Sequence, residues 1–325
     1  MAGEWRTIIL DRGDEGVRVD RVLLRHLRHE RGVSRNRIQK WIEAGDVLIN
    51  HAAPPRAAWR VHAGDELVVR VSQVVERERP QAQAIAIEIL FEDDDLLAVN
   101  KPPGLVVHPS FGNPSGTLMN GLLDLARRWP AGSKPALVGR LDKLTSGVVL
   151  VTKRTEIYQA LQRAMHARRI DKDYLAIVRG KPPARGTIDL ALDRDPWDRR
   201  RVTVTDRGGQ PSITKYERLS TSNGYSLLRC RLITGRTHQI RVHLAARNWP
   251  IVGDATYGPR PGDISRGDAP AAFPRQALHA WRLAFRQPRT GREMVIEAPL
   301  PEDMRALAEA IGLPAVALAK EGLST

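Results

Sequence analysis

The hydrophobic periodicity of the chain changes across residues 72–84, and this change limits the possible folds more than any other feature. Before it, apolar residues recur at helical spacing, as at Val19, Val22 and Leu23. After it, short apolar runs separated by turn residues predict strands, while residues 72–84 themselves have no periodicity. A chain of 325 residues also exceeds the usual size of a single domain. We therefore predict two domains of different architecture, joined by a linker at residues 73–84.

The first domain is predicted to contain two helices and a small β-element. The second helix has Ser34 as its N-cap and ends at Gly45, where the backbone can leave the helical conformation. Short strands are expected at 47–49 and 65–71. The residues of the second helix expected to face the core are Ile38, Trp41 and Ile42.

Basic residues are concentrated on these two helices. Between Arg18 and Lys40, eight basic residues stand against two acidic ones, in a chain whose formal net charge is +14. An excess of fixed positive charge attracts polyanions. A solvated charged face, or an arginine-rich composition that reflects a GC-rich genome, is the ordinary alternative. Because the charge lies on adjacent helices, we favour a phosphate-contacting surface, with Arg35, Arg37 and Lys40 as candidate RNA-binding residues.

The stretch from Val17 to Val71 resembles an S4-type RNA-binding domain. The residues that carry most of the resemblance are RNRIQKWIEAGDVLIN at 35–50. Such domains place a helix pair on structured RNA, so the resemblance implies a small S4-like α/β RNA-binding domain at 16–72.

The second domain, predicted at 85–310, contains more strands than helices. Many of the strands are joined by turns, so an α+β fold with a mixed, mainly antiparallel sheet fits better than a doubly wound parallel sheet. Residues 311–325 are predicted to be a flexible tail. Strands are expected at 85–89, 96–99, 147–152, 174–178 and 225–233, and helices near 117–128, 155–169 and 237–246.

Several classes of protein are excluded by absent signatures. No run approaches the roughly 20 apolar residues that span a bilayer, and the N-terminus has no signal-peptide pattern. The single cysteine, Cys230, excludes an intramolecular disulfide framework, and nine dispersed histidines give no metal-binding motif. Phosphate-binding loops, dinucleotide fingerprints and nucleophile elbows are also absent. We predict a cytoplasmic protein without membrane, metal or cofactor, whose chemistry rests on ordinary side chains.

Three polar segments flanked by apolar strands contain the candidate reacting groups. They are 139–147, which contains Asp142, 171–178, where Tyr174 opens a strand, and 234–244, which contains Arg241. In the third segment, Thr237 is positioned to cap a helix. Taken singly, each has an ordinary explanation, namely a turn-forming aspartate, a half-buried tyrosine and a surface arginine.

Taken together and in this order, the three segments resemble the RluA-type pseudouridine synthases. The resemblance extends over about residues 17–305, nearly the whole chain. The motifs that carry it are GRLDKLTSG at 139–147, DKDYLA at 171–176, TGRTHQIRVHL at 234–244, PIVGDATYG at 250–258 and RQALHA at 275–280.

The resemblance implies an enzyme that isomerises uridine to pseudouridine in RNA without a cofactor. It implies that Asp142 is the catalytic aspartate and that Arg241 pairs with it. Tyr174 would stack against the target uracil and help to move the C5 proton. Arg140 would occupy the space that the extruded uridine leaves in the RNA. The family usually has His before Arg-Leu-Asp, and that position is Gly139 here.

This chemistry is physically consistent with the residues present. Uridine must lose its N1–C1′ bond and rejoin through C5 with no net redox change, after the base has left its stack. An ionised carboxylate can attack the sugar covalently or abstract a sugar proton, and the sequence leaves both open. Arg241 is expected to keep Asp142 ionised and to orient it through a fork-like contact.

The segment LVVHPSFGNPSGTLMN at 105–120 most resembles the D-type branch that acts on the large ribosomal subunit. It implies a target in a stem-loop of large-subunit (23S) ribosomal RNA, although related members modify other large-subunit sites or transfer RNA. We separately expect a monomer. Two other hypotheses remain. One is a non-catalytic RNA-binding or ribosome-assembly protein, for which Gly139 is the only support. The other is a glycosidase or DNA-base enzyme, which normally needs a second carboxylate that the sequence does not identify.

Overall fold

The computed structural model describes residues 4–30, 33–71, 80–110, 112–198, 201–259 and 273–314. The chain forms two compact units, Met1–Arg79 and Pro80–Thr325. Within the described ranges, no helix combines the length and the apolar character needed to cross a bilayer.

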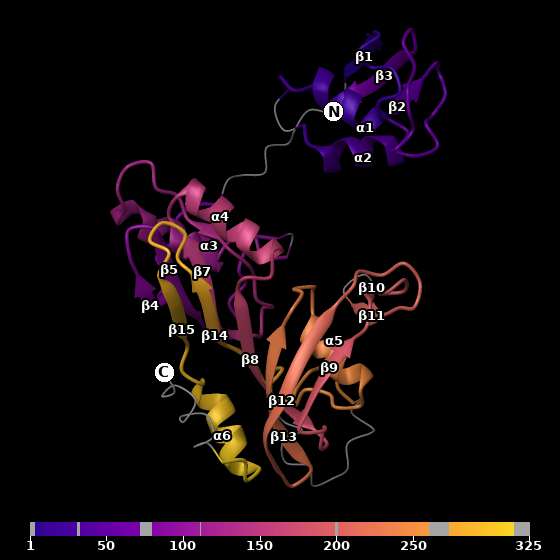
Figure 1. The fold of residues 1–325 in the computed structure, drawn as a ribbon. Coiled ribbons are helices and arrows are strands. Elements are labelled where there is room, and N and C mark those ends of the chain that lie inside the picture. Colours follow the sequence, from indigo (N-terminus) through magenta and orange to yellow (C-terminus); the bar gives the residue numbers. More distant parts are fainter. Residues whose placement is uncertain are drawn as a thin grey trace. The chain divides into compact units, whose positions relative to one another are not determined.

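The N-terminal unit is a three-stranded antiparallel sheet with two helices (Figure 1). Both predicted helices and both predicted strands are confirmed. The sequence does not predict the strand β1, because five of its six side chains are exposed and it pairs with residues far along the chain. The elements are β1 (Glu4–Ile9), α1 (Val19–His26), α2 (Arg35–Glu43), β2 (Val47–Ile49) and β3 (Glu66–Val71), and the strand order is β1-β3-β2.

The sequence signals at the two ends of α2 are confirmed. The Ser34 hydroxyl accepts a hydrogen bond from the Arg37 amide at 3.4 Å, and Gly45 follows the helix with φ of +77°. Glycine adopts this left-handed conformation without the steric cost that other residues meet. The three predicted core residues of α2 are all buried, namely Ile38, Trp41 and Ile42.

The predicted domain boundaries need two corrections. The first unit begins before residue 16, because β1 pairs with β3 along its length and both Leu10 and Asp14 are buried. Residues 73–79 of the predicted linker lie outside the described residues. Residues 80–84 belong to the second unit, since the Gln83 amide donates to the Asn120 carbonyl at 3.0 Å.

The second unit is built on a ten-stranded sheet, so the predicted mixed, mainly antiparallel fold is confirmed (Figure 1). Among the strand pairings of the described residues, the one between β7 and β14 is the only parallel pairing. The strand order is β4-β5-β7-β14-β8-β13-β12-β9, with β15 beside β14 and β6 beside β7. The strands are β4 (Glu88–Glu92), β5 (Leu96–Lys101), β6 (Ala136–Leu137), β7 (Ser146–Thr152), β8 (Asp171–Arg179), β9 (Arg185–Asp189), β12 (Ile213–Ser222), β13 (Tyr225–Leu232), β14 (Leu278–Arg286) and β15 (Glu293–Glu297), while β10 (Leu192–Arg194) and β11 (Val202–Val204) form a separate pair.

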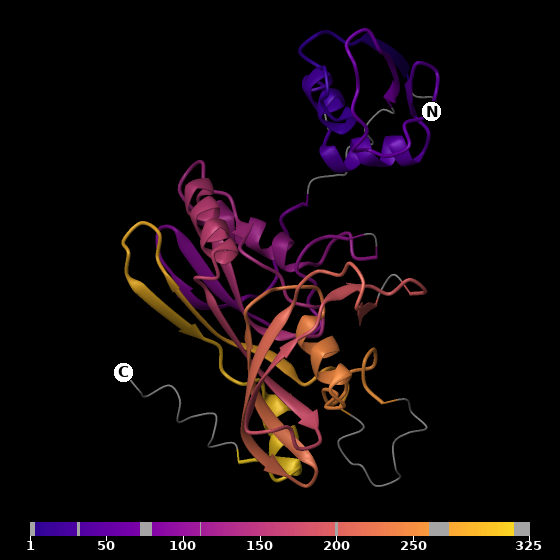
Figure 2. The same cartoon turned by 45° about the vertical axis from the view of Figure 1, so that its right-hand side comes forward.

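Two helices cover opposite faces of β5 and β7 (Figures 1 and 2). Helix α3 (Leu118–Leu125), which is followed by the short 3-10 helix η1 (Ala126–Arg128), packs on one face, and α4 (Thr155–His166) packs on the other. Successive strand residues point to opposite faces, so a strand covered on both sides must be apolar throughout. This explains the uninterrupted apolar runs at 96–99 and 148–151.

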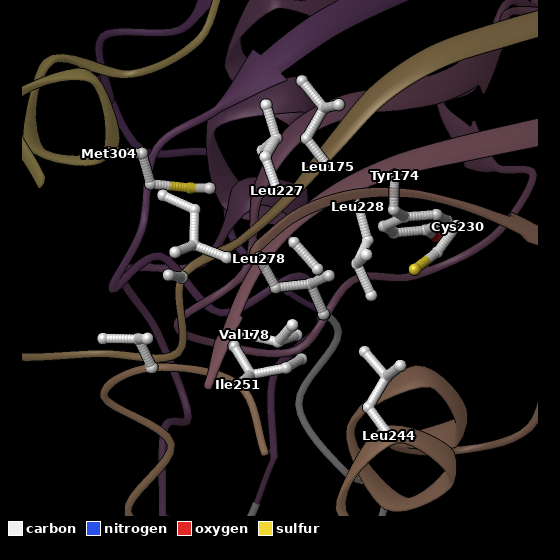
Figure 3. Close-up of a cluster of buried hydrophobic side chains, with 14 of the residues drawn as sticks. Tyr174, Leu175, Val178, Leu227, Leu228, Cys230, Leu244, Ile251, Leu278 and Met304 are labelled. Carbon is white, nitrogen blue, oxygen red and sulfur yellow. The ribbon is translucent and has the colours of Figure 1, made fainter. Parts of the chain in front are cut away.

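The largest core lies around β8, β13 and β14, with α5 (Gln239–Ala246) and α6 (Glu302–Ala310) packed against it. Figure 3 shows Leu244 of α5 and Met304 of α6 among the strand side chains of this core. Ile311 and Leu313 are also buried there. The ordered domain therefore extends beyond residue 310, and residues 315–325 of the predicted tail lie outside the described residues.

The strand predicted at 85–89 is also corrected, because β4 begins only at Glu88. Ile85 and Ile87 pack instead against Gly121 of α3, where a Cβ would lie 2.7 Å from the Ile87 side chain. The sequence pattern does not predict the strands β6, β9 to β12, β14 and β15 or the helix α6.

Candidate active site

The three polar segments found in the sequence meet at one cavity of about 350 Å³. This volume lies within the range of roughly 300–1,000 Å³ that is usual for ligand sites. Each candidate comes from a different element: Asp142 from the loop between β6 and β7, Tyr174 from β8 and Arg241 from α5. Arg140, Lys172 and His238 also line the cavity.

The Asp142 side chain lies on a tight turn that leads into β7. Its carbonyl accepts the Thr145 amide at 3.1 Å, and the carboxyl side chain is 26% exposed. Aspartate is common in such turns, which explains why the sequence signal is ambiguous when Asp142 is considered alone.

The RQALHA segment at 275–280 holds the chain that follows Asp142. Arg275 donates to the Leu144 carbonyl at 3.2 Å, and the Gln276 amide donates to the Thr145 hydroxyl at 3.1 Å. His279 Nδ1 lies 3.0 Å from the Ser146 hydroxyl oxygen, within hydrogen-bond distance. Three successive residues after the Asp142 turn are thus fixed by one distant segment.

Arg241 lies between two carboxylates. Its Nη1 donates to Asp142 Oδ2 at 3.0 Å, while its Nε and Nη2 donate to the two oxygens of Asp254 at 2.7 and 2.9 Å. The expected pairing with Asp142 is therefore present. The expected fork-like contact is wrong, because the two-pronged side of the guanidinium faces Asp254 and Asp142 receives a single bond.

Asp254 is a site residue that the sequence reasoning missed. Its side chain is 1% exposed, and it also accepts the Thr256 and Tyr257 amides at 2.9 and 3.1 Å. Burial raises the pKa of this carboxyl, but the Arg241 guanidinium outweighs burial and the net pKa is lowered. Asp254 is thus held ionised. Its only sequence signal is its place in the PIVGDATYG motif at 250–258.

Tyr174 is 9% exposed and lies at the boundary between the core and the cavity. Burial, with a smaller contribution from the nearby Asp142 charge, raises the pKa of its phenol. Lys172 lines the same cavity two residues earlier on β8, and burial lowers the pKa of its amine.

Arg140 is exposed at the cavity and donates to the Thr237 hydroxyl at 3.1 Å. The prediction that Thr237 caps a helix is wrong. Helix α5 begins at Gln239, and His238 occupies the cap position in the left-handed conformation, with φ of +55°. The Gln239 side chain accepts the Arg236 amide at 3.0 Å and so satisfies a donor near the helix start.

The three basic residues predicted for RNA binding lie on α2 in the N-terminal unit. Arg35 donates to the fully buried Asp20 at 3.2 Å, so it has a structural contact as well as an exposed end. The Arg37 guanidinium lies over the Trp41 ring at 5.6 Å, and Lys40 is exposed. Reversing the charge of Arg35 would therefore also remove one of the two arginine contacts of Asp20, the other being with Arg18.

No group of three or more His, Cys, Asp or Glu side chains among the described residues is arranged to hold a metal ion. The ionisable side chains that line this cavity are one carboxylate, three guanidinium groups, a phenol, an amine and an imidazole.

Comparison with known proteins identifies the class to which this fold and cavity belong. The pattern of the RNA pseudouridylate synthase family matches residues 95–246. Ribosomal large subunit pseudouridine synthase D of Nitrosomonas europaea is 42% identical over 91% of this chain and 85% of its own length. The protein of that name from Xylella fastidiosa is 38% identical over 96% of this chain and 94% of its own length.

A solved structure, human RNA pseudouridylate synthase domain containing 1, has 25% sequence identity and a TM-score of 0.54. The structural match covers 73% of this chain and 98% of the human chain. The chain therefore belongs to the RNA pseudouridylate synthase family, whose members are RNA-modifying isomerases.

Proposed function

We propose that this enzyme converts specific uridines to pseudouridine in a stem-loop of large-subunit (23S) ribosomal RNA. The observation that carries the proposal is the contact of 3.0 Å between Arg241 and Asp142 at the cavity that Tyr174 also lines. The names of the relatives from Nitrosomonas europaea and Xylella fastidiosa support the choice of RNA.

In the proposed mechanism, the flipped uridine enters the cavity with its sugar beside Asp142. The N1–C1′ bond breaks, the base turns, C5 bonds to C1′, and the C5 proton leaves to solvent while N1 gains a proton. Asp142 starts the sequence either by attack on C1′, in which case its bond to C1′ breaks when C5 bonds there, or by removal of a sugar proton that is returned after C5 bonds to C1′. Because the pKa of Tyr174 is raised, its phenol stays protonated and offers a stacking face and a hydroxyl rather than a phenolate base.

Release of tritium from RNA that carries C5-labelled uridine tests the proposal. Asp142→Asn should abolish release without free uracil, and the same RNA should bind with wild-type affinity. Full release by Asp142→Asn would refute the assigned role, and free uracil would indicate a glycosidase. Mapping of pseudouridines in cells that lack the gene tests the target, because sites missing only from transfer RNA would overturn the ribosomal assignment.

The N-terminal unit, in this proposal, is an S4-like domain that binds the RNA outside the target loop, and the enzyme acts as a cytoplasmic monomer. Arg37 and Lys40 of α2 contact phosphates, while Arg35 mainly ties α2 to Asp20. Reversing Arg37 and Lys40 to Glu should weaken binding at low salt and reduce the slope of log K against log salt by about one per lost phosphate contact.

The matched control is Arg12→Glu with Arg56→Glu, which changes the same charge at exposed positions of the same unit that are not part of α2. An equal loss of salt dependence in both double variants would show that only net charge matters and not a surface on α2.

A further inference from the structure

His238, like Arg241, lies close to the Asp142 carboxylate, and the proposed mechanism gives it no role. Its Nε2 lies 3.7 Å from Asp142 Oδ2, and its Nδ1 lies 2.9 Å from the Tyr257 hydroxyl. The side chain is 19% exposed. Both ring nitrogens are therefore directed at protein groups rather than at bulk water.

The Tyr257 hydroxyl determines which nitrogen of His238 carries the proton. This oxygen accepts the Val202 amide at 2.9 Å, and an amide can only donate. The hydroxyl has one hydrogen to donate, and His238 Nδ1 is the acceptor that the described residues place within hydrogen-bond distance of it, so we infer that this hydrogen points at Nδ1. Burial lowers the pKa of His238, so the ring is neutral near pH 7. A neutral ring that accepts at Nδ1 carries its hydrogen on Nε2, which faces Asp142.

We propose that His238 is a positioning residue, whose Nε2–H directs Asp142 by donating to the same oxygen, Oδ2, that Arg241 binds. With two donors on Oδ2, the other oxygen, Oδ1, is left to face the sugar of the flipped uridine. The distance of 3.7 Å is longer than a hydrogen bond in the absence of RNA. Contacts of this kind commonly shorten when the substrate closes the site. This inference rests on the proposed function of Asp142.

The backbone at His238 offers a competing explanation that an experiment can separate. With φ of +55°, His238 lies in the left-handed region, where Asn and His are enriched and most other residues are rare. If only this backbone conformation matters, Asn is the best substitute. If the donor at Nε2 matters, Gln is the best substitute, because its amide nitrogen reaches about as far as Nε2, whereas the Asn amide reaches only to the position of Nδ1.

Single-turnover rates of His238→Gln and His238→Asn therefore test the proposal. His238→Asn should lower the rate constant roughly 10- to 100-fold, as expected for loss of a hydrogen bond to a charged group, with RNA affinity unchanged. His238→Gln should recover most of the rate. Equal rates in the two variants, or a faster His238→Asn enzyme, would overturn the proposal.

Nitrogen-15 spectra of the imidazole provide a readout that does not depend on activity. The wild-type His238 should show a protonated Nε2 and a bare Nδ1, with His238→Gln used for assignment. Tyr257→Phe keeps the aromatic ring that lies 5.0 Å from the Arg241 guanidinium but removes the hydroxyl. The His238 imidazole should then begin to populate the other tautomer, with its hydrogen on Nδ1. A wild-type ring protonated at Nδ1 would refute the inference.

The proposed roles of Asp142 and His238 can be refuted separately. Full activity of Asp142→Asn would remove the proposed role of Asp142, and the role of His238 with it. An inactive Asp142→Asn enzyme combined with a fast His238→Asn enzyme would remove only the role of His238.

Discussion

Arg241 binds two carboxylates, and substituting each one with asparagine should have very unequal consequences for stability. Asp254→Asn should reduce both stability and activity, whereas Asp142→Asn should reduce activity alone. Both changes preserve the size of the side chain, so each variant is the matched control for the other.

The expected magnitude follows from the burial of each contact. The Asp254 side chain is 1% exposed and meets Arg241, itself 7% exposed, through two hydrogen bonds. In Asp254→Asn an amide would face the guanidinium, and removing one partner of a buried pair costs about 3–5 kcal/mol. The melting temperature should then fall by roughly 6–20 °C, at 2–4 °C per kcal/mol for a unit of this size. Asp142 is 26% exposed and makes one bond, so its loss should cost about 1 kcal/mol or less.

Thermal unfolding followed by circular dichroism gives the stability difference. Tritium release under single-turnover conditions, at a temperature where both variants are folded, gives the rate. Asp254→Asn should be roughly 10- to 100-fold slower, because Arg241 loses the anchor that aims it at Asp142. If Asp254→Asn melts together with the wild-type protein, or if Asp142→Asn is the less stable of the two, the assignment of the two sides of Arg241 is wrong.

Three further predictions concern His279, Gly147 and Gly139. Burial lowers the pKa of His279 to about 4. The neutral His279 ring therefore contributes about 3 kcal/mol to the free energy of unfolding above about pH 6.5, and this contribution is lost as pH falls toward 4. His279→Gln should flatten the pH dependence of unfolding, and an unchanged profile would refute this. Gly147→Ala should prevent folding, with a cost above about 4 kcal/mol, because φ is +113° and a Cβ would lie 2.1 Å from the Ala280 carbonyl oxygen; soluble, folded protein would contradict it. Gly139→His should raise the free energy of unfolding, measured by chemical denaturation, by about 0.4–1 kcal/mol and retain activity, since a Cβ at this position would have no other residue's atoms within 4 Å beyond its chain neighbours. A lower free energy of unfolding would contradict this prediction.

The parts of the fold predicted from sequence are those with local causes. Ser34 and Gly45 bound α2 through hydrogen bonding and backbone conformation within a few residues. The apolar run at 148–151 likewise predicts a buried strand from residues that are adjacent in the sequence. By contrast, β12 has mostly half-exposed side chains, and β1 is almost wholly exposed, so neither has an apolar alternation that could be recognised.

The candidate site also has parts that the sequence predicts and parts that it does not. The resemblance to a known family picked out Asp142, Tyr174 and Arg241, which the structure brings to one cavity. It did not pick out Asp254, because an aspartate after a glycine has the ordinary pattern of a turn. Which side of the Arg241 guanidinium each carboxylate occupies depends on residues 99 and 13 positions away, and no local pattern encodes it.

The position of β14 has a consequence for biosynthesis. This strand, at Leu278–Arg286, lies between β7 and β8, although it follows both by about a hundred residues. A nascent chain that has been translated through α5, which ends at Ala246, would hold all the proposed reacting groups but would leave a gap in the middle of its sheet. Since pairings between distant segments form slowly, catalytic competence should arise late, after β14 has left the ribosome and inserted.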